Sequence, residues 1–382
     1  MNQNLRLLYR KKERLSFCFF RGRIMAFFRS RFPSGRVWHG EDECGKIVIA
    51  KIMKRRKTIV KIGIIGAGNI AGTMAKTLNG MEDAKGYAVA SRNLKKAQKF
   101  AGENGFEKAY GSYEEMLRDP EVELVYIATP HSHHYEHIKL CLEHKKPVLC
   151  EKAFTANAAQ AEEVLKISEE KKIFVGEAMW TRFLPSRTMI DEIVKGGEIG
   201  KVHMITANLG YKIDHVERLR KPELAGGALL DVGIYPLSFI RMVTDAKIQS
   251  VTTCCTKLET GVDAQNTAVF QFSDGCIASM HSSMLGGTEQ AGIVYGDKGY
   301  LIAWNINNVN RIQVYDNAKR LVREMTVPEQ ITGFEYEVRA AIKAIQEGRT
   351  ECPQMPHSET LYMMRQMDEL RKTWGVVYPF EP

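Results

Sequence analysis

The sequence predicts an α/β protein of two domains: an N-terminal Rossmann domain with a doubly wound parallel sheet, then a C-terminal α/β domain with a mainly antiparallel open sheet. Three observations support this fold class. The chain has 382 residues, which is too many for one ordinary compact core. Strand-like and helix-like segments alternate from residue 59 to about residue 178. Beyond about residue 180, extended segments follow one another instead.

The Rossmann domain is predicted from the periodicity of its apolar residues. Residues 59–65 form a β-branched run, and residues 87–90 form the next extended run. Between them Ile70, Met74 and Leu78 recur at helical spacing. This is a strand–helix–strand unit, whose two strands are parallel. Further strands are expected at residues 124–128, 148–150 and 173–175, and helices at residues 94–101, 135–143 and 158–170.

The second domain is predicted to carry a mainly antiparallel sheet. Extended segments are expected at residues 202–209, 250–257, 267–272, 276–282, 311–315 and 321–325. The tripeptide Ser273-Asp274-Gly275 joins two of them. A short loop with Asp-Gly between alternating strands is typical of a β-hairpin, and a hairpin makes its strands antiparallel.

Residues 1–57 differ in composition from the rest of the chain. They hold 16 Lys and Arg against 4 acidic residues, whereas the remaining residues hold 38 basic and 41 acidic side chains. The body of the protein is therefore mildly acidic, and neither a nucleic acid nor a membrane is expected as its partner. The apolar pieces at residues 15–20 and 24–28 are too short to span a bilayer.

We interpret residues 1–57 as a basic extension that is disordered or lies upstream of the true start, which we place at Met53. A basic interaction arm and a targeting peptide are the alternatives. An NAD(P)-binding Rossmann domain is expected at residues 58–178, and a domain for substrate binding and oligomerisation at residues 179–382. The eight cysteines form no CxxC pair, which disfavours zinc sites and disulfide frameworks and favours a reducing, cytoplasmic location.

A dinucleotide fingerprint of the form GxGxxA follows the first strand and opens the first helix of the Rossmann domain. Its first glycine permits the tight turn, its second lets the backbone approach a pyrophosphate, and its alanine allows the helix to pack closely on the sheet. The N–H groups and dipole of the helix N-terminus then favour the phosphates. A glycine-rich turn without a ligand is the alternative. The residues concerned are Gly66, Ala67, Gly68, Asn69, Ile70 and Ala71.

The end of the second strand predicts which nicotinamide cofactor binds. Rossmann domains for NAD usually carry Asp or Glu here, which accepts hydrogen bonds from the ribose 2′-hydroxyl. This chain has Ser91 and Arg92 instead. A hydroxyl and a planar guanidinium are suitable donors to a 2′-phosphate, so we expect NADP, with NAD possible. In the alternative interpretation Arg92 only covers a solvated loop.

Further segments resemble the Gfo/Idh/MocA oxidoreductase family. They are ATPHSHHYE at residues 128–136, VLCEK at 148–152 and GGALLDVGIY at 226–235. The segment EAMWTRFLP at residues 177–185 resembles more narrowly the branch of dimeric dihydrodiol dehydrogenases and NADP-dependent D-xylose dehydrogenases. The resemblance extends over residues 59–382, including the closing WGVVYPFE at 374–381. Residues 1–57 have no counterpart in it.

The resemblance implies roles for individual residues. Thr129 and Pro130 would line the cofactor, with Glu151 and Lys152 beside the nicotinamide. Asp231 and Tyr235 would enter from the second domain. Trp180 and Arg182 would contact the cofactor or pack at the domain junction, and His134 would touch cofactor or substrate. Two positions depart from the common pattern: many members have His in place of Tyr235, and Ala153 stands where EKP is usual.

The residue types agree with hydride transfer to and from an alcohol. Oxidation needs a base for the hydroxyl proton, and Tyr235 with Lys152 can supply it. An ammonium beside a phenol favours the phenolate, so Lys152 is expected to lower the pKa of Tyr235 and to stabilise an alkoxide. Asp231 lies one helical turn before Tyr235 and is assigned to the same catalytic group. A surface lysine and a packed aromatic are the alternatives for Lys152 and Tyr235.

Four histidines close together raise the possibility of a metal site: His131, His133, His134 and His137. No carboxylate of suitable spacing completes it, and the stretch falls where the cofactor loop is expected. We therefore predict no metal.

The function predicted is an NADP(H)-dependent oxidoreductase that acts on a sugar, polyol or cyclic trans-diol. A catalytically silent regulator that senses the cofactor is the alternative, although such a protein needs no acid/base pair. A homodimer or higher homo-oligomer, packed through the second domain, is expected because the exposed face of an open sheet is commonly apolar.

Overall fold

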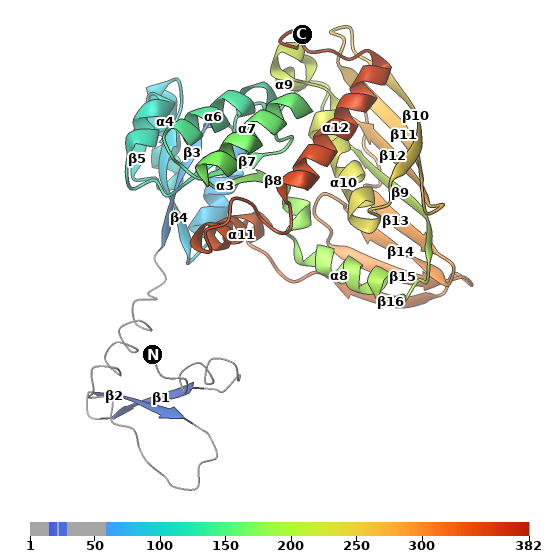
Figure 1. The fold of residues 1–382 in the computed structure, drawn as a ribbon, viewed down its shortest axis with the longest axis horizontal. Helices are drawn as coiled ribbons and strands as arrows, with labels where there is room; N and C mark the ends of the chain where they lie inside the picture. Colours follow the sequence, from blue (N-terminus) through green and yellow to red (C-terminus); the bar gives the residue numbers. More distant parts are fainter. Residues whose placement is uncertain (1–14, 21–22, 29–58, 382) are drawn as a thin grey trace. The chain divides into compact units, whose positions relative to one another are not determined.

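The computed structural model describes residues 15–20, 23–28 and 59–381 (Figure 1). The chain divides into two compact units, Met1–Thr58 and Ile59–Pro382. In the first unit, strands β1 (Leu15–Phe20) and β2 (Arg23–Phe28) pair as an antiparallel hairpin, which the sequence analysis did not predict. The prediction that residues 1–57 precede the true start falls for the most part outside the described residues.

The second unit begins with a parallel six-stranded sheet, as predicted. Its spatial order is β5-β4-β3-β6-β7-β8, which is the order of a doubly wound sheet. The strands are β3 (Val60–Ile65), β4 (Ala84–Ala90), β5 (Lys108–Tyr110), β6 (Leu124–Ile127), β7 (Val148–Glu151) and β8 (Val175–Ala178). The short strand β5 was not predicted, and β8 begins two residues later than the start predicted at residue 173.

Helices cover both faces of this sheet, because alternate strand residues point to opposite sides. Ile62 and Ile64 pack in one hydrophobic cluster with helices α3 (Asn69–Asn79) and α4 (Leu94–Asn104). Ile65 packs in another with α5 (Tyr113–Arg118), α6 (His134–Glu143) and α7 (Ala158–Lys171). Side chains cap α4, α5 and α7 at their N-termini; the capping residues are Asn93, Ser112 and Asn157.

The second sheet has eight strands, in the order β10-β11-β12-β9-β13-β14-β15-β16. All neighbours are antiparallel except β12 and β9, which confirms the predicted mainly antiparallel sheet. The strands are β9 (Val202–Gly210), β10 (Ile248–Lys257), β11 (Asp263–Phe272), β12 (Ile277–Ser283), β13 (Ala291–Gly296), β14 (Gly299–Trp304), β15 (Arg311–Asp316) and β16 (Leu321–Thr326). The predicted hairpin joins β11 to β12, whereas β13 and β14 were missed.

Among the residues that the structure describes, helices cover one face of the second sheet and leave the other uncovered (Figure 1). They are α8 (Pro185–Lys195), α10 (Ile234–Val243) and α12 (His357–Trp374). On the opposite face Met204 of β9 and Ile277 of β12 are register partners on neighbouring strands. Both residues are solvent-exposed, with relative accessibilities of 42% and 48%. This face is the open side of the sheet. The segment Pro222–Val243 has the length and apolarity of a membrane span, but 83% of its most apolar window is buried inside the protein.

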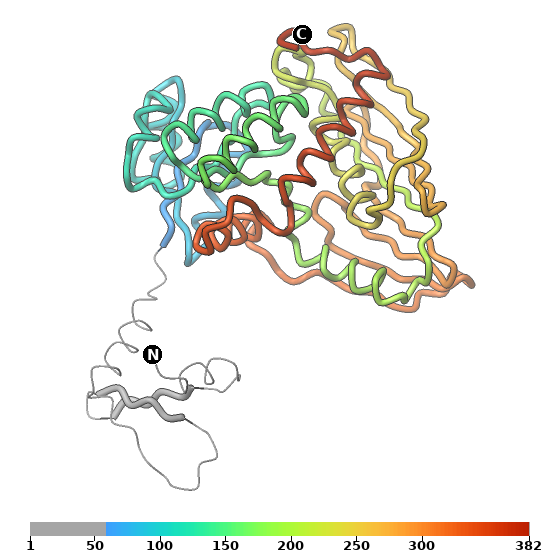
Figure 2. Tube along the Cα trace, in the orientation of Figure 1, coloured from blue at the N-terminus to red at the C-terminus, as the bar shows by residue number. Residues whose placement is uncertain are grey.

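Helix α11 (Glu335–Gln346) returns from the second sheet to the first. Val338, Ala341 and Ile342 share the hydrophobic cluster of Ile62 and Ile64. In Figure 2 this helix, orange-red and late in the sequence, lies beside the blue segments of the first sheet. The domain boundary expected at residue 178 assigns α11 to the second domain. In the structure, however, this helix packs on the Rossmann sheet.

Candidate active site

A cavity of about 790 Å³ opens beside the carboxyl ends of β3, β6 and β7, where a doubly wound sheet places its ligands. One side, the Rossmann wall, consists of Gly68, Asn69, Ile70, Thr73, Ala128, Thr129, Pro130, His131, Glu151 and Lys152. The other side, the outer wall, comes from the second half of the chain. It consists of Tyr211, Ile213, Val216, Glu217, Arg218, Leu219, Asp231, Val232, Tyr235, Asn307 and Phe334.

The fingerprint glycines form a cradle suited to a pyrophosphate. Gly66 has a φ of +105°, and a Cβ there would lie 2.7 Å from the carbonyl oxygen of Ala128. A Cβ on Gly68 would meet nothing within 4 Å, so the space beside it is open. Gly68 precedes α3, and no side chain caps that helix. The first N–H groups of α3 are thus available to an anion, and these residues fit a dinucleotide.

Ser91 and Arg92 follow β4 and do not line the cavity itself. The Ser91 hydroxyl accepts a hydrogen bond of 3.4 Å from the backbone N–H of Asn93. Burial and, to a smaller extent, the charge of Arg92 lower the pKa of His133, a residue that follows β6. The Thr129 hydroxyl is 3.0 Å from Nδ1 of His137, behind the Rossmann wall.

Lys152 and Asp231 connect the two walls. The Lys152 ammonium donates hydrogen bonds to the Asp231 carbonyl oxygen at 2.7 Å and to Asp231 Oδ1 at 3.3 Å. It also lies 5.1 Å from the centre of the Tyr235 ring. The structure therefore brings together the three side chains that the sequence analysis assigned to catalysis. The peptide bond between Lys152 and Ala153 is cis.

Asp231 is held as a carboxylate. Burial alone would raise its pKa, but the charges of Lys152 and Arg218 outweigh burial and hold the pKa below its usual range. Arg218 donates from Nη2 to Asp231 Oδ1 at 2.9 Å, and His131 Nε2 is 4.0 Å from the same oxygen. Burial lowers the pKa of His131 to about 3, so this imidazole is neutral at physiological pH.

The electrostatics of Tyr235 differ from the expectation. Lys152 was expected to lower the pKa of this phenol, but the pKa is raised well above its ordinary value. Burial contributes most, followed by the negative charges of Glu151 and Asp231. The ammonium is already hydrogen-bonded to Asp231, so its charge is largely compensated. In this arrangement Tyr235 is a neutral phenol.

Glu151 lies at the base of the cavity within a buried acidic group. The Tyr126 hydroxyl donates a short hydrogen bond to its Oε1. Burial raises the pKa of Glu151 to about 6, despite that hydrogen bond and the charge of Lys152. Glu337 of α11 is buried nearby, and burial together with Glu151 raises its pKa well above the ordinary value. Both carboxyl oxygens of Glu337 are buried without a hydrogen-bond partner in the described part of the chain.

Three residues assigned to the cofactor lie behind the cavity rather than in its lining. The two ring nitrogens of His134 contact the carbonyl oxygens of Ala153 at 2.9 Å and Thr129 at 2.7 Å. Trp180 stacks on Phe334, with ring centres 4.4 Å apart. Arg182 is paired with the buried Glu359 at 3.2 Å. In this structure these side chains support the walls of the site.

The glycine pair of the GGALLDVGIY segment fixes the outer wall. A Cβ on Gly226 would lie 2.5 Å from the carbonyl oxygen of Leu219, so only glycine permits this approach. Gly227 has a φ of +114°, and a Cβ there would lie 2.2 Å from Asp263 Oδ1. The other oxygen of Asp263 accepts the Leu229 N–H at 2.7 Å. This places the turn of Leu229–Gly233, which carries Asp231, against the cavity.

Several residues of the cavity were not assigned a role from the sequence. Arg218, Tyr211, Asn307 and Phe334 belong to no motif, and His131 was considered only as part of a metal cluster. Arg218 lies on the short helix α9 (Glu217–Arg220), where a short run of charged residues resembles any solvated surface. The sequence offered no signal for Asn307 or Phe334, because only the fold brings them here.

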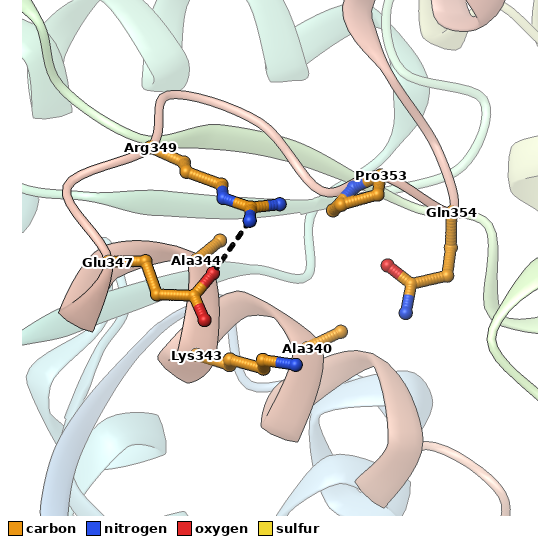
Figure 3. Close-up of a pocket in the computed structure, with 7 residues that line it drawn as sticks. All are labelled: Ala340, Lys343, Ala344, Glu347, Arg349, Pro353 and Gln354. Atoms are coloured by element: carbon orange, nitrogen blue, oxygen red, sulfur yellow. Dashed lines mark ion pairs between the residues drawn. The ribbon is translucent and has the colours of Figure 1, made fainter. Parts of the chain in front are cut away.

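A second, much smaller cavity of about 50 Å³ lies beside α11 (Figure 3). It has room for a few water molecules but not for a sugar or a nucleotide. Among its lining residues Arg349 pairs with Glu347 at 3.1 Å. Within the part of the chain that the structure describes, no group of three or more His, Cys, Asp and Glu side chains is placed to hold a metal ion.

Comparison with known proteins agrees with this geometry. Residues 60–178 match the model of the oxidoreductase family with an NAD-binding Rossmann fold (GFO_IDH_MocA), and residues 188–302 match the GFO/IDH/MocA C-terminal domain. The trans-1,2-dihydrobenzene-1,2-diol dehydrogenase of Mus musculus is 32% identical over 83% of this chain and 97% of its own length. The D-xylose 1-dehydrogenase (NADP(+)) of Hypocrea jecorina is 32% identical over 84% of this chain and 93% of its own length.

Solved structures share the fold at lower identity. A 3-ketoreductase from Actinomadura kijaniata, in complex with NADP and TDP-benzene, superposes with a TM-score of 0.76 at 21% identity, over 82% of this chain and 98% of its own. A levoglucosan dehydrogenase in complex with NADH gives a TM-score of 0.75 at 17% identity, over 83% of this chain and 97% of its own.

Proposed function

Because the chain belongs to the Gfo/Idh/MocA oxidoreductase family, we propose that it is an NADP(H)-dependent dehydrogenase that transfers hydride between nicotinamide and a carbinol carbon of a sugar, polyol or cyclic trans-diol. One observation carries the proposal. Lys152 from the Rossmann wall and Asp231 from the outer wall meet at the base of one cavity, beneath the Tyr235 ring.

The preference for NADP rests on the end of β4. Gly66 and Gly68 offer a cradle for any dinucleotide, but Arg92 adds a guanidinium where an acidic residue would repel a 2′-phosphate. The D-xylose dehydrogenase relative is named for NADP(+). The bound nicotinamide would accept or donate the hydride, and the groups on this chain would handle the proton.

Tyr235 and Lys152 are proposed as the acid/base pair. The Tyr235 phenol is neutral and lines the cavity, so it can donate a proton to a substrate oxygen during reduction. Donation leaves the phenolate, and in oxidation it is this phenolate that accepts the proton of the substrate hydroxyl, while the hydride leaves the carbinol carbon for the nicotinamide. The Lys152 ammonium stabilises negative charge on that oxygen, and Asp231 holds the ammonium in place.

The test is a screen of aldoses, polyols and trans-diols with NADP⁺ and NAD⁺, following the absorbance of the reduced nicotinamide. The proposal expects turnover of at least one substrate of these classes, with a higher kcat/KM for NADP⁺. Tight cofactor binding without turnover of any of them would instead support a cofactor-sensing regulator.

The proposed assembly is a homodimer that buries the open side of the second sheet. Met204 pairs with Ile277 on one neighbouring strand and with Tyr295 on the other. Tyr300 and Tyr315 continue this row as a stacked pair, with ring centres 5.0 Å apart. Such a continuous apolar and aromatic surface favours association. Light scattering at micromolar concentration should therefore show twice the mass of the chain, and a monomer would refute this assembly.

A cytoplasmic location is part of the same proposal. The six cysteines in the described residues are all free thiols: Cys141, Cys150, Cys254, Cys255, Cys276 and Cys352. Free thiols of this number are typical of a reducing compartment. Fluorescent tagging of the full chain in its own cells would test the location.

A further inference from the structure

We propose that Arg218 and Asp231 together bind the hydroxyl group next to the one that is oxidised, so that the enzyme selects neutral vicinal diols. This inference rests on the proposed function and names the substrate feature that the site recognises. It assigns a specificity role to Arg218, which lies outside the recognised motifs. Four features of the outer wall carry it: the fixed position of Arg218, its free donors, the free acceptor of Asp231, and the balance of charge.

The backbone of Arg218 is held in place. The N–H of Gly227 donates to the carbonyl oxygen of Leu219 at 2.9 Å, and a Cβ on Gly226 would lie 2.9 Å from the carbonyl oxygen of Arg218. Tyr378 is buried and donates from its hydroxyl to the carbonyl oxygen of Gly226 at 2.9 Å. Gly226 and Gly227 thus fix α9 against the turn that carries Asp231. As a result, the side chains of Arg218 and Asp231 are held at a defined separation.

The Arg218–Asp231 pair leaves both a donor and an acceptor for a ligand. Arg218 uses Nη2 for Asp231 Oδ1 at 2.9 Å, and its side chain is 43% exposed where it lines the cavity. Within the described part of the chain, its Nε and Nη1 donate no hydrogen bond, and none is donated to Asp231 Oδ2. Lys152 approaches the same Oδ1 at 3.3 Å. A hydroxyl that donates to Oδ2 and accepts from the guanidinium would therefore complete the pair.

The position of the pair identifies which hydroxyl it binds. Lys152 contacts Asp231 on one side and lies under the Tyr235 ring on the other. The oxygen that reacts must lie near the Tyr235 hydroxyl and the Lys152 ammonium. Asp231 accepts a hydrogen bond from Lys152, and Arg218 donates to the same carboxylate. The pair therefore lies next to the reacting oxygen, where the hydroxyl on the neighbouring carbon of the substrate would be.

The charges around the cavity favour a neutral diol over an acid. Lys152 and Arg218 supply two positive charges, while Asp231 and Glu217 supply two negative charges. Glu151, whose pKa is raised to about 6 by burial, adds further negative charge at neutral pH. No net positive charge is left to attract a carboxylate. The apolar side chains of Ile213, Val216 and Leu219 line the outer wall and suit the carbon face of a ring.

The experiment compares substrates that differ by one hydroxyl. The pairs are trans-cyclohexane-1,2-diol with cyclohexanol, and D-xylose with 2-deoxy-D-xylose, each assayed with NADP⁺. Arg218→Met should lower kcat/KM for the diol member by about 10- to 100-fold, the range for a lost hydrogen bond from a charged donor. The loss should fall mainly on KM, because the hydroxyl concerned does not react. The deoxy member should change by less than about threefold.

The matched control is Arg220→Met. Arg220 lies on the same short helix but pairs with Glu259 and does not line the cavity. It should leave the diol preference unchanged, and Arg218→Lys should restore part of it because the charge is retained. Fluorescence titration with NADPH confirms that each variant is folded and binds cofactor.

The outcomes separate the two proposals. If the wild-type enzyme oxidised no aldose, polyol or trans-diol of the screen, the proposed function would fail and this inference with it; if it oxidised others but no vicinal diol, only this inference would fail. If the wild-type enzyme were active but Arg218→Met slowed both members of a pair equally, the proposed function would stand, and Arg218 would be only a structural partner of Asp231.

Discussion

The two walls of the large cavity are built in different ways. The Rossmann wall comes from motifs that are each continuous in the sequence, such as Gly68 to Ile70 and Ala128 to His131. The outer wall presents charged and aromatic side chains from segments that are far apart, such as Arg218, Asp231 and Asn307. The first wall is thus fixed by local conformation, and the second by ion pairs and close backbone contacts.

This difference shows where each kind of change should act. Substitutions in the Rossmann wall should affect cofactor binding, because that wall supplies the cradle and the region of the 2′-phosphate. Substitutions in the outer wall should affect catalysis, selectivity and the stability of its packing. Lys152 belongs to the first wall and pairs with Asp231 of the second, so it should be the most sensitive position of all.

The largest effect is expected where the walls meet. Lys152→Met and Tyr235→Phe should each lower kcat by about 10²- to 10⁴-fold, the usual contribution of a general acid or base. The two losses should not add, since the groups act as a unit. The measurement is steady-state turnover with saturating NADP⁺. Tyr211→Phe, which changes the other tyrosine of the cavity, should cost less than tenfold. Turnover of Tyr235→Phe within threefold of the wild type would remove Tyr235 from the mechanism.

The next effect concerns the packing of the outer wall. Gly227 and Gly261 both have positive φ, at +114° and +90°, but only Gly227 has an atom where a Cβ would lie. Gly227→Ala should therefore lower the free energy of unfolding by about 1–3 kcal/mol more than Gly261→Ala, which is the cost of overpacking without the shared backbone strain. Chemical denaturation of the two variants measures the difference. Equal destabilisation would show that Asp263 moves aside freely.

The third effect tests the Rossmann side alone. Arg92→Asp should raise the KM for NADP⁺ by about 10- to 100-fold, because it removes a charged donor and adds repulsion at the 2′-phosphate. The KM for NAD⁺ should change little, and kcat should be retained. Initial rates with both cofactors decide the matter. A similar rise for both would show that Arg92 does not contact the phosphate.

The smallest effect is a dependence of stability on pH. Burial raises the pKa of Glu151 from about 4.5 to about 6, so its protonated form favours the folded state. That contribution is complete below pH 4.5 and is lost as the pH rises through 6. Glu151→Gln should therefore gain up to about 2 kcal/mol in free energy of unfolding, relative to the wild type, between pH 4.5 and pH 7. Glu136→Gln, at an exposed position on α6, should show no such trend.

The sequence predicted most of the Rossmann sheet because its strands are short apolar runs separated by amphipathic helices. It did not predict β13 and β14. Their ends carry Gly292, Gly296 and Gly299, which resemble loop residues in the sequence. The fold explains one of them: a Cβ on Gly292 would lie 2.5 Å from the Phe239 ring, so this glycine is needed inside a strand. Such close approach between distant segments leaves no periodic signal.

For the candidate site, the sequence by itself marked the fingerprint by its glycine spacing, and marked Lys152, Asp231 and Tyr235 because each stands in a contiguous motif that resembles a known family. Tertiary structure alone decided their electrostatic state. Asp231 compensates the charge of Lys152, and the buried Glu151 adds to the high pKa of Tyr235. It also decided that α11 returns to the first sheet and that Arg218 faces Asp231. Burial and Coulomb interactions depend on distances through space, and residues far apart in the chain acquire those distances only when it folds.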